Sequence, residues 1–251
     1  MMANAAILNT VIQGDCLAEL KRIEAGSVDM ILCDLPYGTT ACKWDTIIPF
    51  EPLWAEYERL IKPNGAIVLT ASQPFTSVLI ASNIQNYRYN LVWEKSHPSN
   101  PMLAKKQPLK YHEDICVFYK KQPIYNPIMT QGKPNHSNNF AGMREGLGGE
   151  IKTVEIKKDG LKYPKSVLKF NCESTKNRKH PTQKPVALFE YLIKTYTDEG
   201  AVILDNCLGS GTTAVAAINT NRNFIGIERE PDYVAIANQR ISDALTASST
   251  L

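Results

Sequence analysis

The fold is decided by the stretch AVILDNCLGSGTTAVAA, residues 201–217. Its first four residues are apolar and predict a short buried strand that ends at Asp205, and a helix is expected over residues 211–220. Gly209 and Gly211 lie in the turn between them, where a ligand can approach the backbone and meet the free N–H groups of a helix start. The stretch therefore indicates either a ligand-binding turn or a tight turn needed only for packing.

An acidic residue after the next strand helps to decide between these two interpretations. Residues 223–227 predict that strand, and Glu228 follows it, twenty-three residues after Asp205. An acid at this place receives the two ribose hydroxyls of a nucleoside cofactor, which favours the ligand-binding turn. The spacing is not GxGxxG and the chain contains no GK[ST], so NAD and a phosphate-binding loop are disfavoured.

A second candidate site is the segment DLPYG, residues 34–38, which follows the apolar run VDMILC of residues 28–33. Open α/β sheets bind their ligands at the carboxyl ends of such strands. The Asp34 carboxylate can accept a hydrogen bond from an amino group, Pro36 has no backbone donor, and the Tyr37 ring can stack on a flat base. A β-turn with a half-buried tyrosine is the alternative interpretation.

Strands and helices alternate on both sides of these two sites. Apolar periodicity predicts helices over residues 51–62 and 74–82, and strands over residues 66–70, 89–93 and 115–119. Residues 95–112 are expected to form a loop, a further helix begins with Pro185 in its first position, and the last helix begins at Pro231. This alternation predicts an α/β fold with a mostly parallel sheet and helices on both faces.

Positive charge is concentrated in one segment of the chain. The net charge of the 251 residues is +3, but residues 151–179 hold nine basic and three acidic residues, whereas the rest holds nineteen and twenty-two. Such asymmetry indicates a polyanionic partner or a solvated loop. Because residues 121–179 are long and lack periodic runs, we interpret them as a functional insert.

Composition indicates a soluble intracellular enzyme. No apolar run approaches the roughly 18 residues of a membrane span, and the first ten residues do not resemble a signal peptide. The six cysteines are scattered, without a CxxC pair or a Cys/His cluster, so we expect reduced thiols and no metal site.

Five motifs resemble those of the β class of amino-group DNA methyltransferases, in which the catalytic motif comes first, the basic insert second and the cofactor motif last, as it does here. Asp34-Leu35-Pro36-Tyr37 resembles the catalytic [DNS]PP[YF] motif, and residues 205–213 resemble the cofactor motif DPFxGSGTT, with Glu228 as the acid that follows it. The element HPTQKP, residues 180–185, and Gly14-Asp15-Cys16 resemble two further family elements. The sequence departs from the pattern at Leu35, which replaces a proline, and at residues 206–208, which replace the usual Pro-Phe pair and its follower.

This resemblance implies a Rossmann-like, S-adenosylmethionine-dependent methyltransferase fold with a circularly permuted motif order. It divides the chain into a catalytic half (1–120), a basic target-recognition insert (121–179) and a cofactor-binding half (180–251). The implied activity is direct methyl transfer to the N6 amino group of adenine extruded from double-stranded DNA. It also implies a cytoplasmic, DNA-associated protein of a bacterium or a phage-infected cell, and homodimerisation.

The site residues implied by the resemblance fall into three groups. The catalytic group is Asp34, Leu35, Pro36 and Tyr37. The cofactor group is Asp15, Cys16, Asp34, Lys184, Asp205, Cys207, Gly209, Ser210, Gly211, Thr212 and Glu228; for Lys184, a surface lysine at a helix start is the alternative. The DNA-binding group is Lys152, Lys157, Lys158, Lys162, Lys165 and Lys169.

Four alternative functions differ from this one in the base, the residues or the motif order that they require. Methylation of cytosine N4 would use the same residues, and a catalytically silent DNA-binding module would require a damaged cofactor site. In methyltransferases of protein glutamine side chains the cofactor loop precedes the catalytic tetrapeptide, the reverse of the order here. Methylation of a cytosine ring carbon is disfavoured because it requires a thiolate nucleophile and the chain has no Pro-Cys dipeptide.

Overall fold

The computed structural model describes residues 6–39, 45–133, 159–173 and 183–248. The chain forms two compact units, one made of Met1–Asn126 with Ser166–Leu251 and the other of Pro127–Lys165. The larger unit contains the main sheet and both candidate sites.

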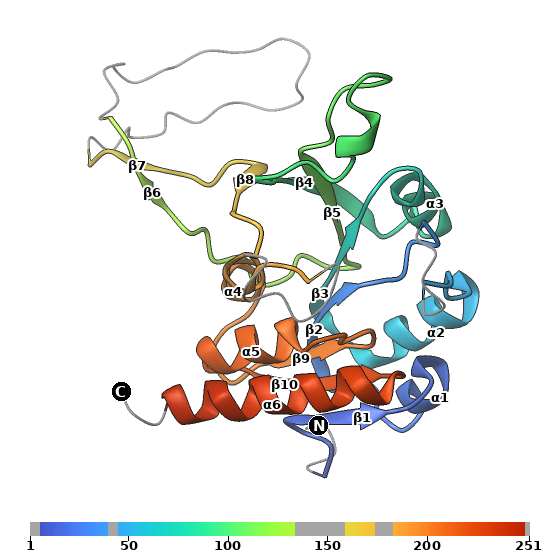
Figure 1. The fold of residues 1–251 in the computed structure, drawn as a ribbon. Helices are drawn as coiled ribbons and strands as arrows, with labels where there is room; N and C mark the ends of the chain where they lie inside the picture. Colours follow the sequence, from blue (N-terminus) through green and yellow to red (C-terminus); the bar gives the residue numbers. More distant parts are fainter. Residues whose placement is uncertain (1–5, 40–44, 134–158, 174–182, 249–251) are drawn as a thin grey trace. The chain divides into compact units, whose positions relative to one another are not determined.

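Eight strands form the main sheet of the larger unit, in the order β1-β10-β9-β2-β3-β5-β4-β8. All their pairings are parallel except those that β5 makes with β3 and β4. The predicted mostly parallel sheet is thus confirmed (Figure 1). The strands are β1 (Thr10–Gln13), β2 (Val28–Asp34), β3 (Ile61–Ala71), β4 (Tyr87–Glu94), β5 (His112–Phe118), β8 (Val167–Lys169), β9 (Val202–Asp205) and β10 (Asn223–Glu228).

Helices cover both faces of this sheet because consecutive strand residues point to opposite faces. On β2, Ile31 and Cys33 belong to one buried cluster and Met30 and Leu32 to another. The first cluster includes residues of α1 (Cys16–Leu20), α2 (Phe50–Leu60) and α3 (Phe75–Ser82). The second includes residues of α4 (Val186–Tyr196), α5 (Thr212–Asn219) and α6 (Pro231–Ser248).

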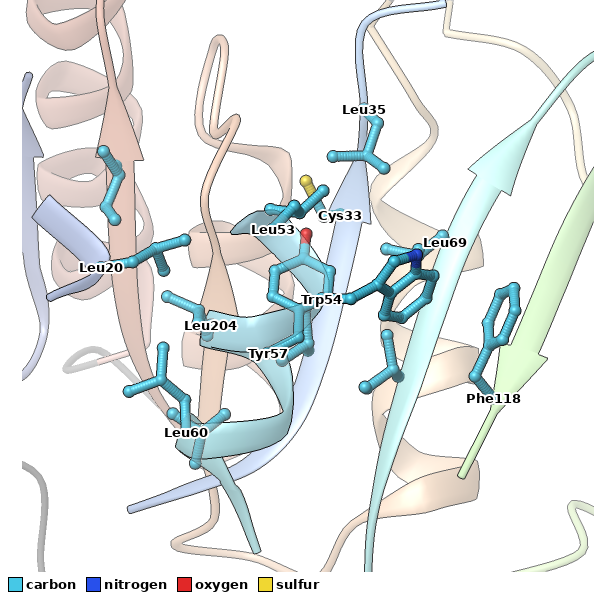
Figure 2. Close-up of a cluster of buried hydrophobic side chains, with 14 of the residues drawn as sticks. Leu20, Cys33, Leu35, Leu53, Trp54, Tyr57, Leu60, Leu69, Phe118 and Leu204 are labelled. Carbon is cyan, nitrogen blue, oxygen red and sulfur yellow. The ribbon is translucent and has the colours of Figure 1, made fainter. Parts of the chain in front are cut away.

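The helix α2 fixes the first face through large aromatic side chains. Trp54 and Tyr57 point from α2 towards β2 and β3, as Figure 2 shows. The Trp54 ring lies 5.0 Å from the ring of Phe118 on β5, measured between centroids. Burying such rings is among the larger single contributions to a core, so α2 is held firmly over the strands that carry the catalytic tetrapeptide.

Several element boundaries differ from the sequence-based expectation, among them the start of α4, the junction of α2 with β3 and the end of the loop before β5. Pro185 is the N-cap of α4, not its first helical residue, with φ −65° and ψ 131°. The helix α2 ends at Leu60, two residues earlier than expected, and residues 61–65 already belong to β3, with a register shift against β2. The loop after β4 contains a 3₁₀ turn, η1 (Pro101–Leu103), and ends one residue earlier than expected because β5 begins at His112.

The strands β2 and β9 pair in parallel, and the chain connections leave a crevice outside their carboxyl ends. From β2 the chain passes through α2 to β3 on one side, and from β9 through α5 to β10 on the other. The connections therefore diverge at the β2–β9 pair, which is where open α/β sheets place ligands, outside the carboxyl ends of the strands. Asp34 ends β2 and Asp205 ends β9, so both candidate motifs begin at this point.

The smaller unit contains the antiparallel strands β6 (Thr130–Gln131) and β7 (Leu161–Lys162). Thr130 pairs with Lys162 and Gln131 with Leu161. Throughout the described ranges, no helix is both long enough and apolar enough to cross a membrane.

Candidate active site at the carboxyl ends of β2 and β9

One cavity of about 700 Å³ unites the two motifs that the sequence analysis singled out. Its walls include all of the predicted catalytic residues and all of the predicted cofactor residues except Gly211. Residues from β4, β5 and the loop between them, Trp93, Lys95, His97, Pro98, Ser99 and Glu113, line it as well. Tyr37 and Gly209, far apart in the sequence, thus face the same space.

The glycine loop after β9 has a backbone that only glycine adopts readily. Gly209 has φ +53° and Gly211, the N-cap of α5, has φ +86°. The Gly209 N–H donates a 2.7 Å hydrogen bond to Oε2 of Glu228, and the Glu230 N–H donates to Oε1 at 2.8 Å. Glu228 is therefore positioned by the loop itself, with each carboxylate oxygen still able to accept another donor.

Asp205 is buried and stabilises this loop through hydrogen bonds. Its Oδ1 accepts from the Cys207 N–H at 3.0 Å, and its Oδ2 accepts from the Thr213 hydroxyl at the start of α5. Burial raises the pKa of Asp205 to about 6, against an ordinary value of 3.8. The next residue, Asn206, accepts a 2.5 Å hydrogen bond from the Tyr57 hydroxyl, which ties the loop to α2.

The segment between β1 and α1 supplies the third wall of the cofactor end. Asp15 is the N-cap of α1, where its Oδ1 accepts from the Ala18 N–H at 3.2 Å. Cys16 follows and lies beside Cys207, whose thiol lowers the pKa of Cys16 by hydrogen bonding. Among the described cysteines, which exclude Cys42, none forms a disulfide, in agreement with the expected thiols.

Asp34 is the most heavily bonded group at the catalytic end. Its Oδ1 accepts from the Tyr37 hydroxyl at 2.7 Å and from the Thr70 hydroxyl, and its Oδ2 accepts from Nζ of Lys184 at 2.6 Å. Thr70 lies opposite Asp34 in the β2–β3 register. Since a carboxylate offers about four acceptor positions, Oδ2 has room for one more donor, such as a substrate amino group.

Lys184 is a buried partner of two carboxylates. Its side chain is 7% exposed, so the surface alternative for this lysine is wrong. Beyond Asp34, its Nζ lies 3.3 Å from Oε2 of Glu113, whose Oε1 accepts from Nζ of Lys95 at 2.8 Å. Burial lowers the pKa of Lys184, but the carboxylates of Asp34 and Glu113 outweigh burial and raise it above its ordinary value. The result is a buried chain of alternating charges, Lys95, Glu113, Lys184 and Asp34.

Tyr37 is fixed at both ends of its side chain. Its hydroxyl is bonded to Asp34, and its ring stacks on Phe75 of α3 with centroids 5.1 Å apart and planes 28° from parallel. Leu35 points into the core and is 3% exposed. The backbone after Tyr37 is held by Asp45, which accepts from the N–H groups of Gly38 and Thr39 at 2.8 and 2.9 Å.

The remaining cofactor residues contact α6 and the residues that precede α4. Arg240 of α6 donates to the Ser210 carbonyl at 2.6 Å, and the Ser210 hydroxyl donates to Gln183 at 3.4 Å. The Thr212 hydroxyl donates to the Lys184 carbonyl at 3.4 Å. Two of these contacts join Gln183 and Lys184, in the described part of the HPTQKP element, to the glycine loop and the start of α5.

The predicted DNA-binding lysines are divided between the two units. Lys162 lies in β7 and Lys165 ends the smaller unit, whereas Lys169 lies in β8 of the main sheet and pairs with Glu94 at 2.9 Å. Lys152, Lys157 and Lys158 lie outside the described residues.

Sequence reasoning missed Glu113, Lys95, Thr70 and Asp45. Only Glu113 carried a usable signal, because it is the first acidic residue after the basic loop of residues 95–112 and precedes the apolar run of β5. The other three become visible only when strand register and loop closure are known.

Known proteins resemble this chain in sequence and in structure. A family model described as DNA methylase, of the N6/N4 methyltransferase type, matches residues 28–239. The DNA adenine methyltransferase YhdJ of Escherichia coli (strain K12) is 30% identical over 252 residues, which cover 94% of this chain and 83% of YhdJ. The type II methyltransferase M2.LlaDCHI of Lactococcus lactis subsp. cremoris is 29% identical over 265 residues, covering 94% of this chain and 90% of that protein. Among solved structures, the M1.HpyAVI–SAM complex superposes with a TM-score of 0.62 at 25% identity, over 92% of this chain and 98% of that one.

Proposed function

Because this chain belongs to the N6/N4 methyltransferase family of DNA methylases, we propose that it transfers a methyl group from S-adenosylmethionine to the N6 amino group of adenine in double-stranded DNA. That the chain is a DNA methyltransferase confirms the predicted enzyme class and fold. The single observation that carries the finer proposal is the shared cavity, which is lined both by Asp34, whose carboxylate can accept a hydrogen bond from an amino group, and by the glycine loop and Glu228.

The cofactor is S-adenosylmethionine, as predicted, and the site fits it. Glu228, held by two backbone N–H groups, would receive the ribose hydroxyls, and Asp15 and Cys16, which line the same cavity, would contact the adenine end. The backbone at Gly209 and the residues that follow it would hold the methionine end. When bound, the cofactor supplies an electrophilic sulfonium methyl group.

The chain's own residues would align and polarise the acceptor amine. The fourth acceptor position of Asp34 and the backbone carbonyls at Leu35 or Pro36 would hold the two amine hydrogens, leaving the nitrogen lone pair directed at the methyl carbon. The bound cofactor would supply the methyl carbon for the new N–C bond and retain the C–S electron pair, and Asp34 would receive the amine proton that is released. Alignment and fixed charges, without a covalent enzyme intermediate, lower the barrier. Tyr37, whose ring stacks on Phe75 and has Nζ of Lys184 5.6 Å from its centroid, would contact the extruded base.

Two observations support adenine over cytosine. The first position of the catalytic tetrapeptide is Asp34, which within the family leans towards adenine, and the relative YhdJ is named as an adenine methyltransferase. Methylation of cytosine N4 remains the alternative within the same family. The intact Gly209–Glu228 contact weighs against a silent DNA-binding module.

Three further parts of the proposal extend beyond the site. We propose that residues 121–179 form the target-recognition insert between the catalytic half, 1–120, and the cofactor half, 180–251. Its lysines would contact phosphates, and a second copy of the chain and a paired restriction enzyme are proposed partners. The relative M2.LlaDCHI is named as a type II methyltransferase.

The test is methylation of unmethylated genomic DNA with labelled S-adenosylmethionine, followed by nucleoside analysis and sequencing. N6-methyladenine at a defined sequence is the expected product; N4-methylcytosine would identify the alternative, and no product would overturn the proposal. Asp34→Ala should lower turnover at least about 10³-fold while the cofactor still binds in calorimetry. Near-normal turnover of this variant would refute the role of Asp34.

A further inference from the structure

The loop between β4 and β5 is a preorganised projection with an apolar tip. We call residues Lys95–Tyr111 the β4–β5 finger. It extends beyond the ends of both strands (green in Figure 1), and its tip carries Met102, which is 93% exposed. Leu103, Leu109 and Tyr111 of the same finger are exposed as well, so its apolar surface is grouped and is not a single scattered side chain.

The finger is closed by its own hydrogen bonds. The Lys95 N–H donates to the Tyr111 carbonyl at 2.8 Å and the Ser99 N–H to the Lys110 carbonyl at 3.0 Å. The Asn100 side chain bridges the two arms, accepting from the Lys110 N–H at 2.6 Å and donating to the Pro108 carbonyl at 3.2 Å. Met102 sits in the 3₁₀ turn η1 that follows. These bonds hold the backbone of the tip in place, which lowers the cost of ordering it on binding.

The root of the finger is part of the catalytic cavity. Lys95, His97, Pro98 and Ser99 line the cavity together with Asp34 and Tyr37. Met102 is three residues beyond Ser99, so its Cα lies within about 11 Å of that wall. A base seated beside Asp34 would thus leave its duplex close to the finger tip.

The charge of the finger matches a nucleic acid. Residues 95–111 contain four lysines and no acidic residue. Lys105 and Lys106 are exposed directly after the η1 turn, while Lys95 pairs with Glu113 and Lys110 donates to Ser72. Exposed lysines beside an apolar tip combine phosphate contacts with a side chain that can enter a base stack.

From these observations we infer that the β4–β5 finger inserts Met102 into the DNA duplex at the position vacated by the extruded base, while Lys105 and Lys106 contact the flanking phosphates. This inference rests on the proposed base-extruding DNA methylation. Extrusion costs a few kcal/mol of unstacking and unpairing, and an apolar side chain that fills the gap stabilises the opened duplex.

The test compares two oligonucleotide duplexes that carry the methylation site found by sequencing. In one the target base is paired; in the other it lies opposite an abasic position, so that little pairing is left to break. Met102→Ala should lower kcat/KM on the paired duplex by roughly tenfold or more and on the abasic duplex by no more than about twofold. With 2-aminopurine at the target position, the fluorescence rise caused by wild-type protein should be lost in Met102→Ala.

Matched variants control for the loss of exposed apolar surface and of charge. Ile84→Ala removes another exposed apolar side chain, 61% exposed, before the opposite end of β4, and should leave both duplexes unaffected. Lys105→Gln/Lys106→Gln should weaken DNA binding, whereas Lys21→Gln/Lys194→Gln, with the same change in charge, should not.

Two results would overturn the inference: unchanged kcat/KM of Met102→Ala on the paired duplex, or equal losses on both duplexes, which would indicate a general role of the loop. If the wild-type protein methylates no DNA, the proposed function itself fails. Wild-type activity with an unaffected Met102→Ala variant refutes only the finger.

Discussion

Glu113 is the residue on which the charge balance of the catalytic end depends. It neutralises two buried ammonium groups, those of Lys95 and Lys184. Burial raises the pKa of the Glu113 carboxyl, but the charges of Lys184 and Lys95 more than offset this, so that its pKa lies below the ordinary value. Glu113 is therefore ionised at neutral pH, and through Lys184 it positions Asp34.

Glu113→Gln should destabilise the fold and slow catalysis. Breaking a buried ion pair costs about 3 kcal/mol or more, because Lys95 is left without a carboxylate and Lys184 retains only Asp34. We expect this loss in the free energy of unfolding measured with denaturant at pH 7, together with a fall in kcat and little change in the dissociation constant of the cofactor.

Glu58→Gln is the matched control for this prediction. Glu58 pairs with Lys120 at the surface, with side chains 38% and 53% exposed, and an exposed pair contributes at most about 1 kcal/mol. Equal effects of the two variants on stability would refute the importance of the buried charge chain.

Asp205 makes the free energy of unfolding fall as the pH rises, whereas an acid paired at the surface makes it rise. Its pKa is about 6 in the folded chain because of burial, against 3.8 when unfolded. The proton held by the folded chain stabilises it fully below about pH 4, and this contribution is lost as the pH rises to about 6, by at most about 3 kcal/mol.

Asp205→Asn removes this titration and isolates the effect from that of other acids. The free energy of unfolding of the wild-type protein minus that of the variant should fall between about pH 4 and pH 6 and be constant above about pH 7. Urea unfolding at a series of pH values measures this difference. A difference that rises with pH would show that Asp205 is ionised and well paired in the fold.

At the scale of elements, the glycine loop packs against α6 at the point where α5 begins. A Cβ atom at Gly211 would lie 3.1 Å from both Cα and Cβ of Ala237 on α6, whereas one at Gly200 would meet nothing within 4 Å. Both glycines have positive φ, +86° and +79°. The two positions therefore share the backbone strain of a substitution and differ in the space available.

Gly211→Ala should destabilise the protein more than Gly200→Ala does. Strain at positive φ costs about 1–2 kcal/mol in both, and overpacking against α6 adds about 1–3 kcal/mol at Gly211 alone. Thermal unfolding measures the difference, and calorimetry should show weaker cofactor binding only for Gly211→Ala. Equal effects would mean that α6 moves aside without cost.

The elements that bear the site were predictable, and their partners were not. The apolar runs of β2 and β9 and the acid that ends each one follow from local pattern alone, because buried parallel strands are nearly continuous in apolar residues. The antiparallel β5 brings Glu113 beside Lys184 through pairing across the sheet, and local periodicity contains no information on such register. The predicted helix position of Pro185 was wrong by one residue, because the backbone angles of proline suit both the N-cap and the first turn of a helix.

For the molecule as a whole, hydrophobic periodicity alone did not reveal which distant parts of the chain meet. Gly14 donates a hydrogen bond to the carbonyl of Glu228 at 3.0 Å, so the two termini of the larger unit build one cofactor wall. The resemblance to a permuted motif order predicted this meeting, whereas periodicity predicted only two separate α/β regions. The exposed Met102 lay in a segment interpreted merely as a loop, because exposure cannot be read from composition.

The concentration of positive charge in residues 151–179 predicts how DNA affinity depends on salt. Each lysine that contacts a phosphate releases a condensed counterion on binding, so the logarithm of the association constant falls with the logarithm of salt concentration by about 0.9 per contact. Lys162→Gln/Lys165→Gln should weaken binding to all duplexes alike and reduce this slope by about 2. Lys21→Gln/Lys194→Gln, which makes the same change in net charge outside this segment, should leave the slope unaltered. Fluorescence anisotropy of labelled duplex from about 50 to 200 mM salt measures both variants. If their slopes match, then the affinity arises from net charge alone and not from phosphate contacts made by the basic segment.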